Sequence, residues 1–107
     1  MKKNFRRNVE DILDELGTPL SLDGYRFLTE ATLIRRDNPI IPQTDIYKML
    51  AKRYKTTWSI VERAIRHTRD FMGDDNIKKK YKLNTRVTNT VLTNLLCREA
   101  ERRGMND

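Results

Sequence analysis

The chain has 107 residues, of which 37% are apolar and 35% are charged. That length suits one domain with a modest core, and apolar residues at helical spacing argue against disorder. A net charge of +7 and a pI of about 9.8 favour a polyanionic partner. Because Cys97 and His67 are the only cysteine and histidine, an internal disulfide and a Cys/His metal site are excluded.

No segment looks like a signal or an anchor. The N-terminus, MKKNFRRNVED, is charged without an apolar stretch, and no apolar run approaches membrane-spanning length. We therefore expect a soluble, cytoplasmic protein that does not bind a membrane. The absence of strand-like alternation predicts an all-α fold, a compact bundle of five to six helices. We expect residues 1–107 to form a single domain, with a helix-turn-helix at about 44–72.

The first two helices follow from apolar spacing. The first has one apolar stripe and ends at Gly17 and Pro19. Its stripe consists of Phe5, Val9, Ile12, Leu13 and Leu16. The second covers about 22–36, with Ser21 or Asp23 as its N-cap, and has a wide apolar arc that suits a central helix.

The third helix is expected at about 45–54, capped by Gln43 or Thr44, after an apolar connector at 40–42 that packs on the core. Its inner face is expected to hold Ile46, Met49, Leu50 and Tyr54. The small and apolar positions of a helix-turn-helix are matched by Ala51, Tyr54, Val61, Ala64 and Ile65. Lys55 stands where the turn often has glycine, so either it adopts a less favoured backbone conformation or the turn differs slightly.

The helix at about 57–72 has two unlike faces. The expected apolar face holds Trp58, Val61, Ile65, Thr68 and Met72, so we place Trp58 in the core rather than in base stacking. The polar face holds Ser59, Glu62, Arg63, Arg66 and Asp70, with His67 at its edge. Such a face can bond base edges and phosphates together. We interpret this helix as the one that enters a DNA major groove.

The remaining chain is basic. Residues 74–107 carry eight basic and five acidic side chains, and residues 43–73 carry seven and three, whereas residues 1–42 are balanced at seven each. Residues 73–76 (GDDN) are expected to stop the preceding helix, and 77–83 (IKKKYKL) forms either a short helix or a basic loop. The last helix is expected at about 89–103 with Gly104 as its cap and Cys97 buried.

Several stretches resemble the DNA-binding effector domain of the master sporulation response regulator of spore-forming Firmicutes. The closest is VERAIRH (Val61 to His67) within the helix-turn-helix. ILDELGTP (12–19), GYRFLTEA (24–31) and TNTVLTNLL (88–96) resemble its first, second and last helices. The resemblance covers residues 9–72 almost without gaps.

The resemblance implies a six-helix fold that binds short boxes of double-stranded DNA, often as tandem head-to-tail dimers. It implies that Glu62 and Arg63 read bases and that Arg66 and His67 lie near the backbone and neighbouring bases. It also implies that a basic residue before the last helix, here Arg86, approaches DNA.

The chain departs from the family pattern in two places. Ile60 stands where the family often has arginine, so one polar contact is missing or replaced. The segment between the recognition helix and the last helix is shorter and basic, and in the family that segment carries much of the polymerase-contacting and dimer surface. The sequence given has no stretch for a receiver domain, so we expect no phosphorylation control of the usual kind in it.

The predicted site therefore has two sets of residues and no cofactor or metal. Base contacts are predicted for Glu62, Arg63 and Arg66, although Glu62 could instead pair with Arg66 at i+4. Phosphate or edge contacts are predicted for Thr57, Ser59, His67, Lys55, Arg86, Lys79 and Lys80. No catalytic constellation is evident, so we expect a DNA-binding regulator, with RNA polymerase as a further partner. The alternative is an interaction module that pairs with and antagonises a full-length regulator.

Overall fold

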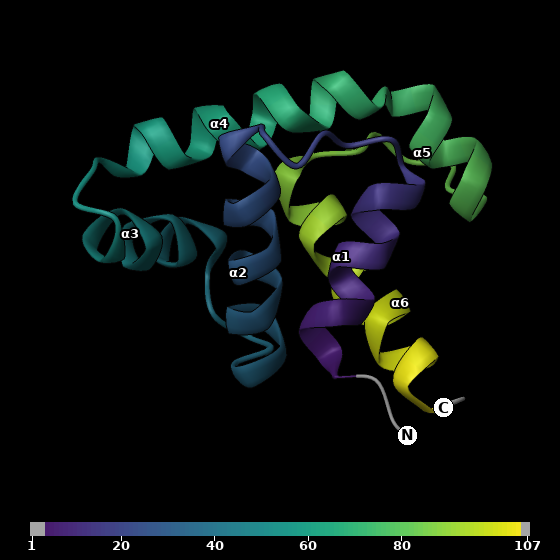
Figure 1. The fold of residues 1–107 in the computed structure, drawn as a ribbon, viewed down its shortest axis with the longest axis horizontal. Helices are drawn as coiled ribbons and strands as arrows, with labels where there is room; N and C mark the ends of the chain where they lie inside the picture. Colours follow the sequence, from purple (N-terminus) through teal and green to yellow (C-terminus); the bar gives the residue numbers. More distant parts are fainter. Residues whose placement is uncertain (1–3, 106–107) are drawn as a thin grey trace.

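The computed structural model describes residues 4–105, which form six helices connected by short loops (Figure 1). In chain order these are α1 Phe5–Glu15, α2 Asp23–Asp37, α3 Gln43–Arg53, α4 Trp58–Met72, α5 Asp74–Tyr81 and α6 Asn89–Met105. No strand occurs in this part of the chain, so the all-α prediction is confirmed. Within the same residues, no helix is both long and apolar enough to cross a membrane.

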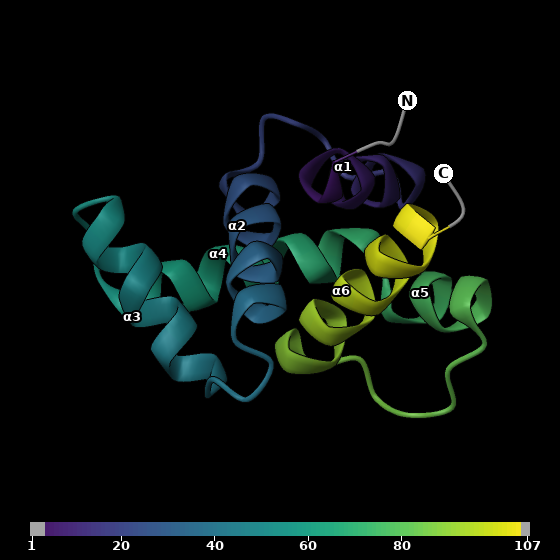
Figure 2. The same ribbon diagram turned by 90° about the horizontal axis from the view of Figure 1, so that it is seen from below.

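The helices are arranged around α4, which lies along one edge of the molecule across the ends of α1 and α2 (Figure 1). α3 packs beside its first half, and α5 continues beyond its last turn. α6 packs against α1, α2 and α4 from the other side, and its position next to α1 is clear in the turned view (Figure 2). No other helix covers one long side of α4 in the part of the chain that the structure describes.

The core is built from the faces that the apolar spacing indicated. The predicted stripe of α1 is buried at Val9, Ile12, Leu13 and Leu16. α2 buries apolar side chains around a wide arc, because it contacts α1, α3, α4 and α6. These side chains are Tyr25, Phe27, Leu28, Ala31 and Ile34. Cys97 is buried as predicted, and burial raises the pKa of its thiol to about 12, so the thiol stays protonated.

Several predicted helix ends are correct and others are wrong. Gly17, with φ +78°, follows α1 as predicted, and Thr57 caps α4 by accepting from the Ile60 amide at 3.3 Å. The predicted caps of α2 and α3 are wrong, since Leu22 and Pro42 occupy the N-cap positions without side-chain bonds. The prediction that α6 ends before Gly104 is also wrong, because the helix continues to Met105.

The segment after α4 forms a helix, which decides between the two alternatives for 77–83. Gly73, with φ +88°, separates α4 from α5, and the residues expected only to stop α4 open α5 instead. Ile77 is fully buried and anchors α5 on the core. The helix ends at Tyr81, so the end of the predicted basic stretch is loop.

Three apolar residues expected in the core are exposed. Trp58 is 49% exposed, because the first turn of α4 extends beyond α2 (Figure 1). Met49 is 43% exposed, since α3 buries Tyr47 beside Ile46 rather than Met49. In the connector before α3, Ile40 is 89% exposed, and only its neighbour Ile41 packs against the core.

Candidate nucleic-acid interface

The position of α4 is fixed from one side by a very close approach of α2. Gly24, at the start of α2, lies so near α4 that a Cβ there would be 1.9 Å from Thr68 Oγ1 and 2.5 Å from the Ala64 carbonyl oxygen. Both distances are shorter than any real Cβ contact. Only glycine fits at this crossing, and α2 thereby sets how α4 lies on the bundle (Figure 1).

The turn before α4 is held from the other direction. Lys55 has φ +54°, so of the two alternatives for this turn the less favoured, left-handed conformation is the one observed. The next amide, of Thr56, donates to the Ala51 carbonyl at 2.9 Å. Just before the turn, Arg53 and Tyr54 both donate to the buried Glu30 carboxylate on α2. The two helices of the predicted helix-turn-helix are therefore both tied to α2.

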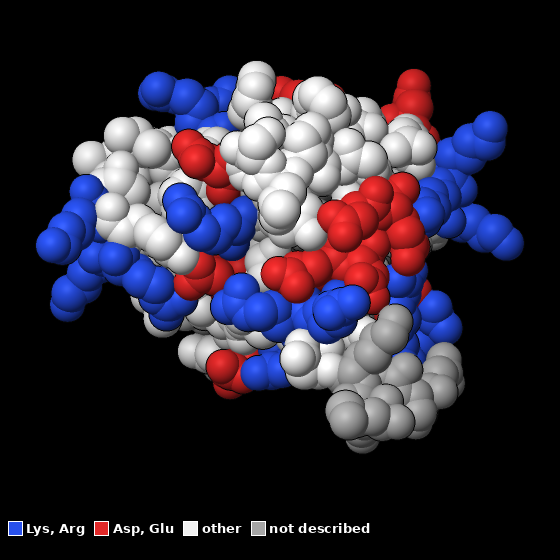
Figure 3. Space-filling model, in the orientation of Figure 1, with Lys and Arg blue, Asp and Glu red and all other residues white. Residues whose placement is uncertain are grey.

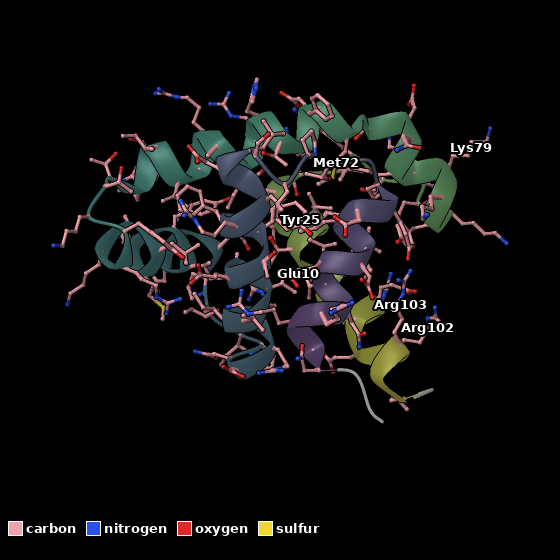
Figure 4. All side chains as sticks on the ribbon, viewed as in Figure 1. Glu10, Tyr25, Met72, Lys79, Arg102 and Arg103 are labelled. Carbon is pink, nitrogen blue, oxygen red and sulfur yellow. The ribbon has the colours of Figure 1, made fainter. Side chains whose placement is uncertain are left out.

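The uncovered side of α4 carries the predicted polar face. Its members Ser59, Arg63, Arg66, His67 and Asp70 are exposed, and Glu62 is partly exposed. On the opposite side, Val61, Ile65, Thr68 and Met72 are buried. Side chains of α4 project along the upper edge of the molecule in Figure 4. The predicted division of this helix is confirmed except at Trp58.

The charged groups of this face differ in their partners. Arg66 Nε donates to Glu62 Oε2 at 3.2 Å, which is the i+4 pair that the sequence allowed for Glu62. Arg63 and His67 make no hydrogen bond or ion pair with any residue between 4 and 105. Arg63 and the terminal nitrogens of Arg66 are therefore available as donors to an external acceptor.

A buried asparagine links this face to the interior, and sequence reasoning missed it. Asn89, the first residue of α6, donates from Nδ2 to Glu62 Oε2 at 3.2 Å and to the Tyr47 hydroxyl at 3.1 Å. Its Oδ1 accepts from Arg69 Nη1 at 3.0 Å. In the sequence, Asn89 stands at the expected start of the last helix, and Arg69 was assigned no role. The one available signal was that Arg69 lies on the flank of α4 between its polar and apolar faces.

The predicted phosphate contacts are distributed around α4. Thr57 and Ser59 lie at its N-terminus, and Lys55 is exposed in the preceding turn. Arg86 lies near the other end, where it lines a hollow of about 200 Å³ together with Arg69 and Asp70. Arg86 therefore lies beside the C-terminal part of α4, whereas Lys55, Thr57 and Ser59 lie at its N-terminal end.

The lysines of α5 are not equivalent. Lys79 has no ion-pair partner among the described residues and points away from the body of the protein (Figure 4). Lys80 Nζ lies 3.6 Å from Glu15 Oε1 on α1, and Lys78 pairs with Asp74 within α5 at 2.9 Å. Only Lys79 is free to meet an external anion without first breaking a pair.

Acidic side chains are gathered on another side of the molecule. They lie over α1, which faces the viewer in Figure 3, whereas long basic side chains project outward beyond α3, α4 and α5. The acidic residues of α1 are Glu10, Asp11, Asp14 and Glu15. Acidic side chains are thus concentrated over α1, where Arg7, Lys80 and Arg103 pair with some of them.

The site offers no arrangement for metal binding within the described residues, because no group of three or more His, Cys, Asp or Glu side chains comes together there. Its chemistry is that of guanidinium donors and one imidazole along α4, with the carboxylates of Glu62 and Asp70 on the same face and the Lys55 ammonium in the preceding turn.

Residues 9–96 match the protein family described as "Sporulation initiation factor Spo0A C terminal". The chain therefore belongs to this family, and the resemblance found in its sequence is confirmed. The family is a DNA-binding domain of a transcription regulator and is not a catalytic family.

Proposed function

We propose that this protein binds double-stranded DNA sequence-specifically, with α4 in the major groove, and that it regulates transcription. The observation that carries the proposal is the polar face of α4. That face is uncovered on the second helix of a helix-turn-helix, while the opposite face is buried and the helix is fixed by Gly24. A rigid helix with free guanidinium groups suits base reading, because base contacts depend on fixed geometry.

In this proposal the residues have distinct roles. Arg63 and Arg66 donate to guanine edges, and Glu62 accepts from a base amino group. The phosphate contacts come from Thr57 and Ser59 at the helix start, His67 on its edge, Lys55, Arg86, Lys79 and Lys80. Contacts of this second kind position the protein and supply the salt dependence, but they carry no sequence information.

The direct test is selection of binding sites from random double-stranded DNA, followed by mobility-shift titration on the selected box and on a scrambled sequence. We expect a defined box and a much weaker shift on the scrambled DNA. Enrichment of no sequence, with similar shifts on both DNAs, would contradict sequence-specific binding. No shift on either DNA at low salt would favour the interaction module that antagonises a full-length regulator.

Arg63→Ala tests base reading at one residue. Because Arg63 has no partner within the described residues, its loss leaves no orphaned carboxylate. We expect about tenfold weaker binding to the selected box, within the 1–3 kcal/mol that a good bidentate contact supplies, and a much smaller loss on scrambled DNA. Arg98→Ala is the matched control, since Arg98 is exposed on α6 and also has no partner among the described residues. It lines a hollow to which α4 contributes no residue and which Arg102 borders near the end of α6 (Figure 4), and its removal also takes away one charge. Equal losses on both DNAs would refute base reading by Arg63.

The family's tandem arrangement extends this proposal to a homodimer on paired boxes. DNA with two head-to-tail copies of the selected box should bind two chains, and cooperative binding of the second would support a dimer on DNA. RNA polymerase as a further partner is tested by transcription from a promoter that carries the same boxes.

A further inference from the structure

The proposed site includes Glu62, whose carboxylate is held in an unusually defined way. Its Oε2 accepts two hydrogen bonds, one from Arg66 Nε and one from Asn89 Nδ2, each at 3.2 Å. Its Oε1 accepts none from the residues that the structure describes. Since a carboxylate oxygen has two lone pairs, Oε2 is saturated and the acceptor capacity of this group remains on Oε1.

The side-chain amide of Asn89 can form its hydrogen bonds only in the orientation in which Nδ2 faces Glu62. Its Oδ1 faces Arg69 Nη1, which has no acceptor, and its Nδ2 faces the Glu62 carboxylate, which has no donor. Exchanging the amide oxygen and nitrogen would therefore break both bonds. Asn89 is also buried and donates to Tyr47 on α3. It is thus locked by α3, α4 and α6 together before any ligand arrives.

We propose that Asn89 is a positioning residue for base recognition, and that it fixes Glu62 so that Oε1 accepts a hydrogen bond from a cytosine amino group. This inference rests on the proposed function, because it assigns one base to a residue of the same site. An acceptor-only atom selects a base that presents a donor in the major groove, which is the N4 amino group of cytosine or the N6 amino group of adenine. Adenine also presents its N7 acceptor next to N6, which would face the carboxylate, so cytosine fits better. A carboxylate already held in one rotamer loses little further freedom on binding.

The same arrangement explains how Glu62 can pair with a neighbouring arginine and still accept a hydrogen bond from a base. Arg66 uses only Nε for the pair, so its two terminal nitrogens stay available to a neighbouring guanine or phosphate. The Glu62 side chain remains 28% exposed despite its two partners. Glu62 and Arg66 therefore form one rigid unit that offers an acceptor and a donor pair side by side.

The test compares base preferences of four proteins in parallel selections from random DNA: wild type, Glu62→Ala, Asn89→Ala and Asn8→Ala. Glu62→Ala identifies the position in the box that Glu62 reads. We expect Asn89→Ala to lose roughly fivefold in cytosine preference at that same position, while the position read by Arg63 is unchanged. The double variant Glu62→Ala/Asn89→Ala should lose no more there than Glu62→Ala alone, because the two residues act as one unit.

Asn8→Ala is the matched structural control. Asn8 is also a buried asparagine whose Nδ2 links two helices, since it donates to the Ala100 carbonyl at 3.3 Å, but it lies on α1 away from α4. Its loss should lower the unfolding temperature and leave every base preference intact. If Asn89→Ala behaves in the same way, with affinity lowered equally for all sequences, the positioning role is overturned.

Two additions keep the inference testable if a variant or the proposed function fails. Asn89→Asp keeps the acceptor for Arg69 but places a second carboxylate beside Glu62, so it should lose the same cytosine preference if Asn89→Ala does not fold. In the DNA-free protein, the ¹³C signal of the Glu62 carboxyl carbon should shift when Asn89 is replaced. An unchanged signal would overturn the hold of Asn89 on Glu62, whereas a wild-type protein without any base preference would instead refute sequence-specific binding.

Discussion

α4 and α5 follow one another with only Gly73 between them, and both are basic, yet they are attached to the molecule very differently. α4 buries four side chains along its length and packs against α2, α3 and α6. α5 has one buried side chain, Ile77, with Tyr81 partly buried beside it. Because packing of an apolar face is what holds a helix in place, α4 is fixed from Val61 to Met72 and α5 near one point.

The charges of the two helices show the same contrast. Each helix has one Lys or Arg without a partner among the described residues, Arg63 on α4 and Lys79 on α5, whereas the other Lys and Arg side chains of both helices are paired. On α4 the free guanidinium stands on a fixed backbone beside the held Glu62. On α5 the free ammonium ends a long flexible chain on a lightly anchored helix. Composition makes these segments look alike, whereas anchoring suits α4 to reading bases and α5 to supplying charge.

The largest effect on this contrast is expected from Gly24→Ala, which would displace α4. The added Cβ would meet the Ala64 carbonyl oxygen at 2.5 Å, and a backbone atom cannot turn aside as a side chain can. We expect the free energy of unfolding to fall by about 2–3 kcal/mol, as in other overpacked contacts. Urea unfolding followed by circular dichroism measures this, and binding to the selected box should weaken with it.

Gly104→Ala provides the matched control for that change. The site lies within α6, where a Cβ would find its nearest neighbour, Asn8 Nδ2, at an ordinary 3.7 Å. Alanine there should leave stability unchanged or raise it by up to about 1 kcal/mol, because it favours helix. If Gly24→Ala proved as stable as Gly104→Ala, the close crossing of α2 and α4 would be wrong.

The sequence predicted the parts of the fold that depend on periodic burial. The stripe of α1, the apolar face of α4 from Val61 to Met72 and the central position of α2 follow from local patterns and are confirmed, and the left-handed Lys55 is one of the two alternatives that the turn allowed. Trp58 and Ile40 were misplaced, because periodicity shows which way a side chain points but not where the covering helix ends. The predicted N-caps of α2 and α3 were wrong because residue type alone does not decide where a helix begins. The N-cap positions are occupied by Leu22 and Pro42, although suitable polar residues stand nearby.

The candidate site was predicted only in part. Its exposed residues follow from the spacing within one helix, whereas the buried residue that holds Glu62 belongs to another helix. Arg63 and Arg66 lie on the polar face by spacing alone. Asn89 is 27 residues from Glu62 in the chain, so its bond to Glu62 depends on how α6 packs against α4. A contact between distant residues leaves no periodic signal in a single sequence.

Two lysines in the left-handed conformation allow α4 and α5 to be compared with substitutions that change stability less than Gly24→Ala does. Lys55, with φ +54°, precedes α4, and Lys82, with φ +55°, ends α5. Glycine adopts this conformation without strain, so Lys55→Gly and Lys82→Gly should each stabilise the fold by roughly 0.5–1 kcal/mol. Differential scanning calorimetry should show a similar rise for both.

DNA binding should separate these two variants. Lys55 is a proposed phosphate contact beside α4, so Lys55→Gly should weaken binding and reduce the salt dependence by about one charge. Lys82→Gly, at the end of α5, should have the smaller effect on both quantities. A larger loss for Lys82→Gly would place DNA closer to α5 than to the turn before α4.

The smallest effects on DNA binding are expected within α5. There, the ion-pair partner of each lysine decides how much that lysine contributes to binding. Lys79→Ala should reduce the slope of log Kobs against log salt concentration by about 0.9, the value for one phosphate contact. Lys80→Ala should reduce it less, because Lys80 must leave Glu15 before it can meet a phosphate. Both losses should be equal on the selected box and on scrambled DNA, since a flexible ammonium carries no base information. A change in base preference with Lys79→Ala would show that α5 also reads sequence. The proposed difference in function between α4 and α5 would then be wrong, although the two helices would still differ in how they are anchored.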